Sequence, residues 1–116
     1  MKRVLVVDDN HEILNVIEII LQGEGYDVLC VDTGEDLKQK VLLAQPNLIL
    51  LDIMLGAYNG LELCRELKND PQTLQVPIVM ISASHNIDKT SCEAEGFIAK
   101  PFEIDYLINK VAVHVN

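Results

Sequence analysis

Short apolar runs alternate with longer segments of helical periodicity along this chain. The runs Val4–Val7, Leu48–Leu51 and Val76–Ile81 are almost continuously apolar, which is typical of strands buried on both faces of a parallel sheet. Tyr26–Val31 and Phe97–Ala99 have the length and composition of two further strands. The pattern therefore predicts five strands separated by helical segments.

The segments between the predicted strands carry apolar residues at helical spacing. The predicted stripes consist of Ile13, Val16, Ile17, Ile20 and Leu21, then Leu37, Val41 and Leu42, then Leu61, Cys64 and Leu67. Thr33 is the predicted N-cap of the second helix. The stripe in Asn86–Glu95 is weak, so we expect a shortened fourth helix, and a closing helix is predicted from Glu103 to about Val113.

This alternation of strands and helices predicts an α/β fold, with an open parallel sheet covered by helices on both faces. Right-handed crossovers leave few possible connections between parallel strands. The flavodoxin-like, doubly wound strand order 2-1-3-4-5 is the one that fits five strands. At 116 residues the chain has the length of one domain, which we expect to span residues 1–116.

Charge and composition narrow the possible partners. The chain has 9 basic and 18 acidic residues and a net charge of −9, so we expect no direct binding to nucleic acid or to anionic membranes. No apolar run is long enough to span a bilayer, and the amino terminus lacks a signal-peptide pattern, so we expect a cytoplasmic protein. Cys30, Cys64 and Cys92 are odd in number and widely spaced, and we interpret them as buried free thiols.

Polar residues directly follow four of the predicted strands. Asp8 and Asp9 follow the first strand, Asp52 the third, Ser82 the fourth and Lys100 the fifth. The carboxyl ends of parallel strands meet at one edge of a sheet, and ligands bind there beside the point where strand order reverses. We therefore expect these side chains to form one site.

The residue types indicate which ligand such a site would take. The turn after the first strand lacks the glycines that cradle a pyrophosphate; its Asn10 is expected to cap the following helix. Three carboxylates repel one another, so either one keeps its proton or a cation such as Mg²⁺ (or Mn²⁺) lies between them. With that cation, Lys100 and Ser82 are suited to hold a phosphoryl group, which one carboxylate would attack.

Four segments carry these residues, and they occur in a distinctive order. They are Val4–Asn10, Leu50–Leu55, Val76–Ala83 and Lys100–Phe102, with Gly60 after the second. Each segment alone is a modest signal. Taken together and in this order, they resemble the receiver domains of two-component response regulators over essentially the whole chain.

The resemblance implies a role for each residue of the acidic cluster. Asp52 would be the phosphoacceptor. Asp9 would bind the metal directly, and Asp8 through water or as a second contact. The backbone carbonyl of Met54 would be a further metal ligand, together with Asp52.

The resemblance also implies a conformational switch. Ser82 would move toward the phosphoryl group, Lys100 would pair with it, and Phe97 at the aromatic switch position would turn inward. The Lys100–Pro101 peptide would be cis. Two departures from the family stand out: Gly56 replaces a usual proline, and the connection between Ser82 and Lys100 is about one helical turn short.

The predicted function is therefore that of a response regulator receiver. It would accept a phosphoryl group from a sensor histidine kinase or a phosphotransfer protein and switch its contact with a downstream protein target. It would turn over no external substrate, so we do not expect an enzyme; a Mg²⁺-dependent phosphatase would need an aspartate where Met54 stands. The alternative is a constitutive receiver-like interaction module that is not phosphorylated. A single-domain regulator and a segment of a longer regulator both fit these residues.

Overall fold

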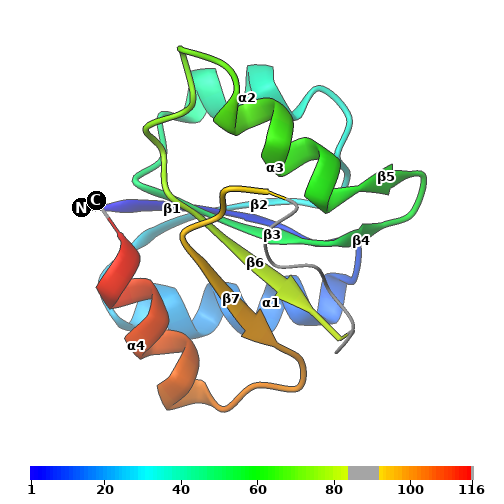
Figure 1. Ribbon diagram of the computed structural model, residues 1–116. Helices are drawn as coiled ribbons and strands as arrows, with labels where there is room; N and C mark the ends of the chain where they lie inside the picture. Colours follow the sequence, from blue (N-terminus) through cyan, green and yellow to red (C-terminus); the bar gives the residue numbers. More distant parts are fainter. Residues whose placement is uncertain (84–91, 116) are drawn as a thin grey trace.

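The computed structural model describes residues 1–83 and 92–115, whose strands form an open parallel sheet with helices on both faces (Figure 1). The sheet consists of β1 (Arg3–Val7), β2 (Asp27–Val31), β3 (Leu48–Asp52), β6 (Ile78–Ser82) and β7 (Gly96–Ala99). The described helices are α1 (His11–Gly23), α2 (Leu37–Ala44), α3 (Gly60–Lys68) and α4 (Ile104–His114). A separate hairpin joins β4 (Met54–Leu55) and β5 (Tyr58–Asn59).

The strand order of the five-stranded sheet is β2-β1-β3-β6-β7, and all neighbouring strands in it are parallel. Counting only the strands of this sheet, the order is 2-1-3-4-5, so the predicted flavodoxin-like fold is confirmed. Helices α1 and α4 cover one face, and α2 and α3 cover the other (Figure 1).

Burial on both faces explains why the sequence of the central strand β3 does not alternate between apolar and polar residues. All five of its residues are buried. Leu48 and Leu50 pack into the core beneath α1 and α4, whereas Ile49 and Leu51 pack into the core beneath α2 and α3. A strand covered on both faces has no solvent-facing side, so a polar side chain at any position would lose its contact with water.

The predicted start of the second helix is wrong. The Thr33 hydroxyl accepts a hydrogen bond from the Glu35 N–H at 3.1 Å, so it satisfies a local turn rather than a helix end. Helix α2 begins at Leu37, after Asp36 adopts a left-handed backbone with φ of 53°. Leu42, predicted to lie in the apolar stripe, is 36% exposed, because the short helix turns only part of that stripe toward the sheet.

The connection between Asp52 and Gly60, predicted as a loop, contains the antiparallel hairpin β4–β5. Leu55 is 3% exposed and anchors this hairpin in the core. Gly56 opens its turn with φ of 65°. Proline is restricted to φ near about −65°, so this turn is closed to the proline that is usual in the family, and the hairpin accounts for that departure.

A lysine and a glutamate tie α3 to the starts of β6 and β7. The Lys68 ammonium donates to the Val76 carbonyl at 2.9 Å and to Glu95 Oε2 at 2.7 Å. The other oxygen of Glu95 accepts the Ile78 N–H at 2.7 Å. The predicted fourth helix, over Asn86–Glu95, lies outside the described residues up to position 91, and described residues 92–95 are not helical.

The prediction that all three cysteines are buried is wrong for one of them. Cys64 and Cys92 are buried, but Cys30 is exposed because it lies on β2, an edge strand of the sheet. Burial raises the pKa of the Cys64 thiol, which makes it a poor nucleophile. In the described part of the chain, no helix has the length and apolarity needed to cross a membrane.

Candidate functional site

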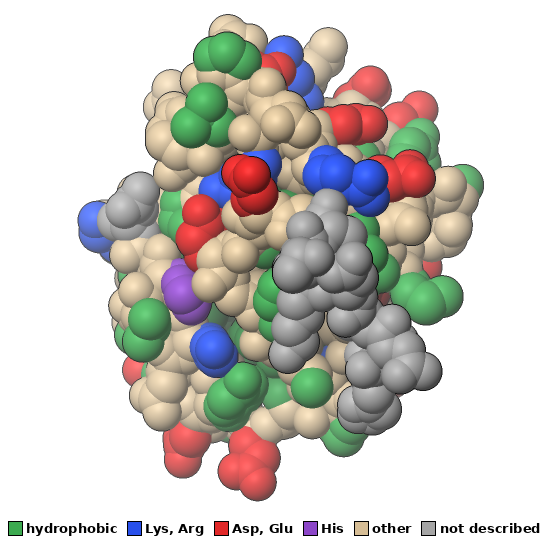
Figure 2. Space-filling model, in the orientation of Figure 1, with side chains coloured by type: hydrophobic (Ala, Val, Ile, Leu, Met, Phe, Trp, Pro, Cys, Tyr) green, Lys and Arg blue, Asp and Glu red, His purple; other side chains and the backbone are tan. Residues whose placement is uncertain are grey.

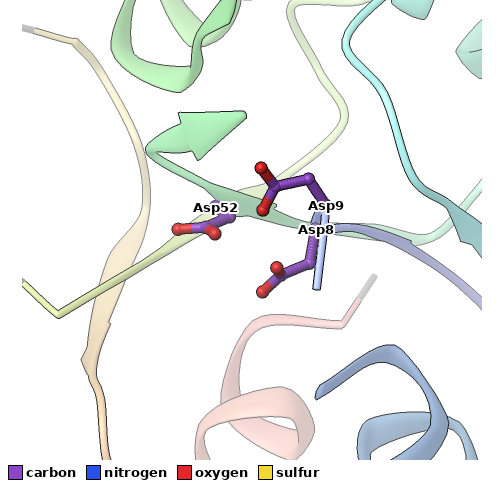
Figure 3. A group of neighbouring side chains, drawn as sticks. All are labelled: Asp8, Asp9 and Asp52. Atoms are coloured by element: carbon purple, nitrogen blue, oxygen red, sulfur yellow. The ribbon is translucent and has the colours of Figure 1, made fainter. Parts of the chain in front are cut away.

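Two neighbouring strands bring three carboxylates together. Val7 of β1 is paired with Leu51 of β3, so the residues that follow, Asp8 and Asp52, lie side by side at the carboxyl end of the sheet. Asp9 is the next residue after Asp8. Figure 3 shows the three side chains projecting into one region, and carboxylate oxygens of all three lie within 4.8 Å of one another.

Lys100 supplies a positive charge to this cluster from the end of β7. Its ammonium donates to Asp8 Oδ2 at 2.8 Å and to Asp52 Oδ2 at 3.2 Å. The side chains of Asp8, Asp52 and Lys100 are 0%, 7% and 17% exposed. Such pairs are weakly screened by solvent, so each charge depends strongly on the others. The Lys100–Pro101 peptide is cis, as the family resemblance implies.

The pKa values reflect burial first and then the surrounding charges. Burial raises the pKa of Asp52, the Asp8 carboxylate raises it further, and Lys100 lowers it only in part, so that it stands at about 6. Burial lowers the pKa of Lys100, but the hydrogen bonds and charges of Asp8 and Asp52 raise it on balance. Lys100 is therefore charged at neutral pH, yet it does not offset the carboxylates fully.

Backbone amides orient two of the carboxylates. The Asn10 N–H donates to Asp8 Oδ1 at 2.9 Å, and the Met54 N–H faces Asp52 Oδ1 at 3.4 Å. The Asn10 side chain also accepts the N–H groups of the first turn of α1, which confirms its predicted capping role. Capping and carboxylate placement therefore depend on the same turn.

Ser82 and Phe97 lie on the strands beside this cluster. Ser82 is the last residue of β6, is 4% exposed, and accepts the Lys100 N–H at its carbonyl, at 2.8 Å. Phe97 lies in β7, partly buried against the core beneath α2 and α3. Their predicted roles in a switch remain predictions, but Ser82 shares the carboxyl edge of the sheet with the acidic cluster.

The arrangement fits a hard divalent cation. Three carboxylates face one ammonium, so negative charge is left over, and burial together with the Asp8 carboxylate raises the pKa of Asp52. Mg²⁺ prefers carboxylate and carbonyl oxygens together with water. Asp9, which is exposed, leaves one side of the cluster open to solvent, where water and a phosphoryl oxygen have access.

The structure shows why glycine occupies position 60, which the sequence did not reveal. A Cβ atom on Gly60 would lie 2.1 Å from the Asp52 carbonyl oxygen and 2.7 Å from the Ile53 Cα. Its N–H also donates to the Ile53 carbonyl at 2.7 Å. The start of α3 thus packs directly on the backbone that carries Asp52, and only glycine allows that approach.

Gly60→Ala is therefore expected to lower the free energy of unfolding by about 2 kcal/mol, because backbone must shift to admit the methyl group. Urea denaturation measures the loss. Gly23→Ala is the matched control, since a Cβ there meets nothing within 4 Å. Equal stability of the two variants would contradict this account of the packing at Gly60.

Comparison with known proteins shows which family this chain is similar to. The family model for the response regulator receiver domain matches residues 4–112. The fold is similar to that of a Chloroflexus aurantiacus protein assigned as a response regulator, with 30% identity, a TM-score of 0.89, and coverage of 97% of this chain and 95% of that one. It is also similar to the chemotaxis protein CheY4 of Vibrio cholerae, with 25% identity, a TM-score of 0.90 and 99% coverage of both chains.

A third similar structure bears on the metal. It is the receiver domain of the sensor histidine kinase PA1611 from Pseudomonas aeruginosa, which has a magnesium ion coordinated in its active-site cleft. The identity is 25%, the TM-score is 0.88, and the match covers 97% of this chain and 96% of that one. The fold, the acidic cluster at its carboxyl edge and the family match together show that this chain belongs to the response regulator receiver domain family.

Proposed function

We propose that Asp52 is the residue that accepts the phosphoryl group, from a phosphohistidine of a sensor histidine kinase or a phosphotransfer protein. The observation that carries this proposal is the meeting of Asp8, Asp9 and Asp52 with Lys100 at one edge of the sheet. Of the three carboxylates, Asp52 is the one on the central strand β3, as its last residue, and in the sheet β3 lies between β1, which leads into Asp8, and β7, which leads into Lys100.

The residues that would hold Mg²⁺ (or Mn²⁺) are Asp8, Asp9, Asp52 and the backbone carbonyl of Met54. When bound, the cation would supply positive charge against the charge that develops on the phosphoryl oxygens. The nucleophile is the ionised carboxylate of Asp52. With a pKa of about 6, Asp52 is mainly in this ionised form at neutral pH.

The transfer forms a bond between a carboxylate oxygen of Asp52 and phosphorus and breaks the bond between phosphorus and the donor imidazole nitrogen. The electron pair of that bond stays on the imidazole. Lys100, which donates to Asp52 at 3.2 Å, is positioned to exchange this hydrogen bond for one to a phosphoryl oxygen. Ser82 would donate its hydroxyl to another.

The proposed output is a contact with a downstream protein. Ser82 and Phe97 would report phosphorylation by moving together, as the family resemblance implies. The chain would act in the cytoplasm as one receiver domain over residues 1–116, without turnover of an external substrate. The net charge of −9 supports a protein target rather than direct binding to nucleic acid or membrane.

The test is intact-mass measurement after incubation with acetyl phosphate, with and without Mg²⁺. We expect a gain of one phosphoryl group that needs Mg²⁺, is absent in Asp52→Asn, and persists in Asp27→Asn, a control on the edge strand β2. No gain in folded protein with any donor would overturn the proposal. A gain that survives Asp52→Asn would move the acceptor to another residue.

A further inference from the structure

A groove of about 440 Å³ lies between α2 and α3, outside the acidic cluster. Figure 1 shows both helices on the same face of the sheet, with the hairpin β4–β5 beside the start of α3. Tyr58 and Asn59 of that hairpin also line the groove. Ligand pockets in proteins occupy about 300–1,000 Å³, so this groove has room for a large side chain.

The inner wall of the groove is apolar and closely packed. Leu37 and Leu67 line it and are each 3% exposed. A Cβ on Gly34 would lie 2.9 Å from the Tyr58 side chain and 2.7 Å from Leu63 Cδ1, so the loop before α2 is seated directly on the hairpin and α3. This contact holds the Tyr58 ring at the groove, where it is 39% exposed.

The rim of the groove is acidic. Asp36, Glu62 and Glu66 line it and form no ion pair with any residue in the ranges 1–83 and 92–115. Among the described lining residues, Lys38 is the one basic side chain, and it is paired with Asp70. The groove therefore presents negative charge that its own residues do not offset, on a protein whose acidic side chains are spread over the visible face (Figure 2).

We propose that this groove is a docking site for an arginine-bearing basic segment of a partner protein. The arginine stem would lie on Leu37, Leu63 and Leu67, and its guanidinium would reach the rim carboxylates. A guanidinium donates to carboxylates in a planar fork and stacks on aromatic rings, and the exposed part of the Tyr58 ring in the groove lining provides such a surface.

The spacing of the acids favours an organic cation over a metal ion. Within the described residues, the group of acidic side chains close enough to chelate a metal is Asp8, Asp9 and Asp52. No three of the described groove acids come as close together as that group does. A guanidinium carries several N–H donors spread over a plane, so it can contact carboxylates that a single ion cannot bridge.

The proposal does not depend on phosphorylation of Asp52, which is absent from the groove lining. It is tested in unphosphorylated protein without Mg²⁺, by two-dimensional NMR of the ¹⁵N-labelled chain. The probes are N-acetyl-arginine amide and its uncharged counterpart, N-acetyl-citrulline amide. We expect saturable shifts of the Gly34, Tyr58 and Glu62 amides with the arginine probe and none with citrulline.

Two double variants separate the groove from general charge attraction. Glu62→Gln with Glu66→Gln is expected to weaken arginine binding about tenfold, since charge-assisted hydrogen bonds are lost. Glu24→Gln with Glu103→Gln removes the same charge from exposed positions outside the groove and should leave binding unchanged. Equal weakening in both, equal shifts with both probes, or shifts centred on Asp8 and Asp52 would overturn the proposal.

Discussion

Replacing Asp52 with asparagine is expected to stabilise the metal-free protein by about 3 kcal/mol near neutral pH. The pKa of Asp52 is raised from 3.8 to about 6 by burial and by the Asp8 carboxylate, despite Lys100. The ionised form is therefore the costly one in the folded state. Asparagine keeps the shape of the side chain and removes that charge.

The same shift sets the direction of the pH dependence. Between the unfolded pKa of 3.8 and the folded pKa of about 6, the folded protein binds more protons at Asp52 than the unfolded chain does. The contribution of Asp52 to stability is therefore most favourable below that window and is lost as the pH rises through it. Asp52→Asn should remove this part of the pH dependence.

Urea denaturation of the metal-free protein at about pH 5 and about pH 7.5 checks both expectations. Asp36→Asn is the control, because Asp36 is exposed, has no side-chain cap bond, and adopts a left-handed backbone that asparagine tolerates. Its effect should stay within about 0.5 kcal/mol. Equal stability of Asp52→Asn and the parent chain near neutral pH would contradict the cost assigned to the buried, ionised Asp52 side chain.

Lys100→Met is expected to have a comparable effect of opposite sign, a loss of about 4 kcal/mol. Methionine keeps an unbranched stem but leaves Asp8 and Asp52, whose side chains are 0% and 7% exposed, without their counter-charge. The pKa of Lys100 is raised on balance by those carboxylates. Its contribution is thus full below the unfolded pKa and is lost as the pH rises through the folded one, in the alkaline range. Of these two residues, Asp52 is therefore the one whose titration changes the stability across neutral pH.

A double-mutant cycle isolates this interaction. In the Asp52→Asn background, Lys100→Met should cost roughly half as much, because one of the two carboxylates no longer needs a counter-charge. Phosphorylation of the Lys100→Met chain by acetyl phosphate should also slow, by roughly 100-fold. Lys110→Met, which removes an ammonium that lies over the Tyr106 ring of α4, is the control for loss of a lysine. Strict additivity of Lys100→Met and Asp52→Asn would contradict a shared charge network.

The strands and their order were predictable because burial on both faces leaves a strong local signal. β1 contains the unbroken apolar run Val4–Val7 and β3 the run Leu48–Leu51, and the polar residues directly after these runs mark the carboxyl edge of the sheet. The acidic residues that form the cluster could therefore be named from the sequence. What made them one site is the parallel register that sets Asp8 beside Asp52.

Shorter and weaker elements could not be predicted in this way. The hairpin β4–β5 has strands of two residues each, too short for any periodicity, and it exists because Leu55 is held in the core. Thr33 is of a residue type that often caps helices, but its hydroxyl accepts a hydrogen bond from Glu35 within its own turn. The exposure of Cys30 follows from the edge position of β2, which depends on pairing with distant segments.

The sequence by itself determined the fold class, the strand order and the set of residues at the carboxyl edge, because these follow from local apolar patterns and from the handedness of connections. Tertiary structure alone decided how those residues interact. Lys100 contacts both Asp8 and Asp52, which are distant from it in the sequence. Gly60 approaches the Asp52 backbone closely only because α3 packs on it. The raised pKa of Asp52 likewise depends on burial and on neighbours that the fold brings together. The strength of these interactions depends on burial and on the distances between groups, and neither can be predicted from the local pattern of residues.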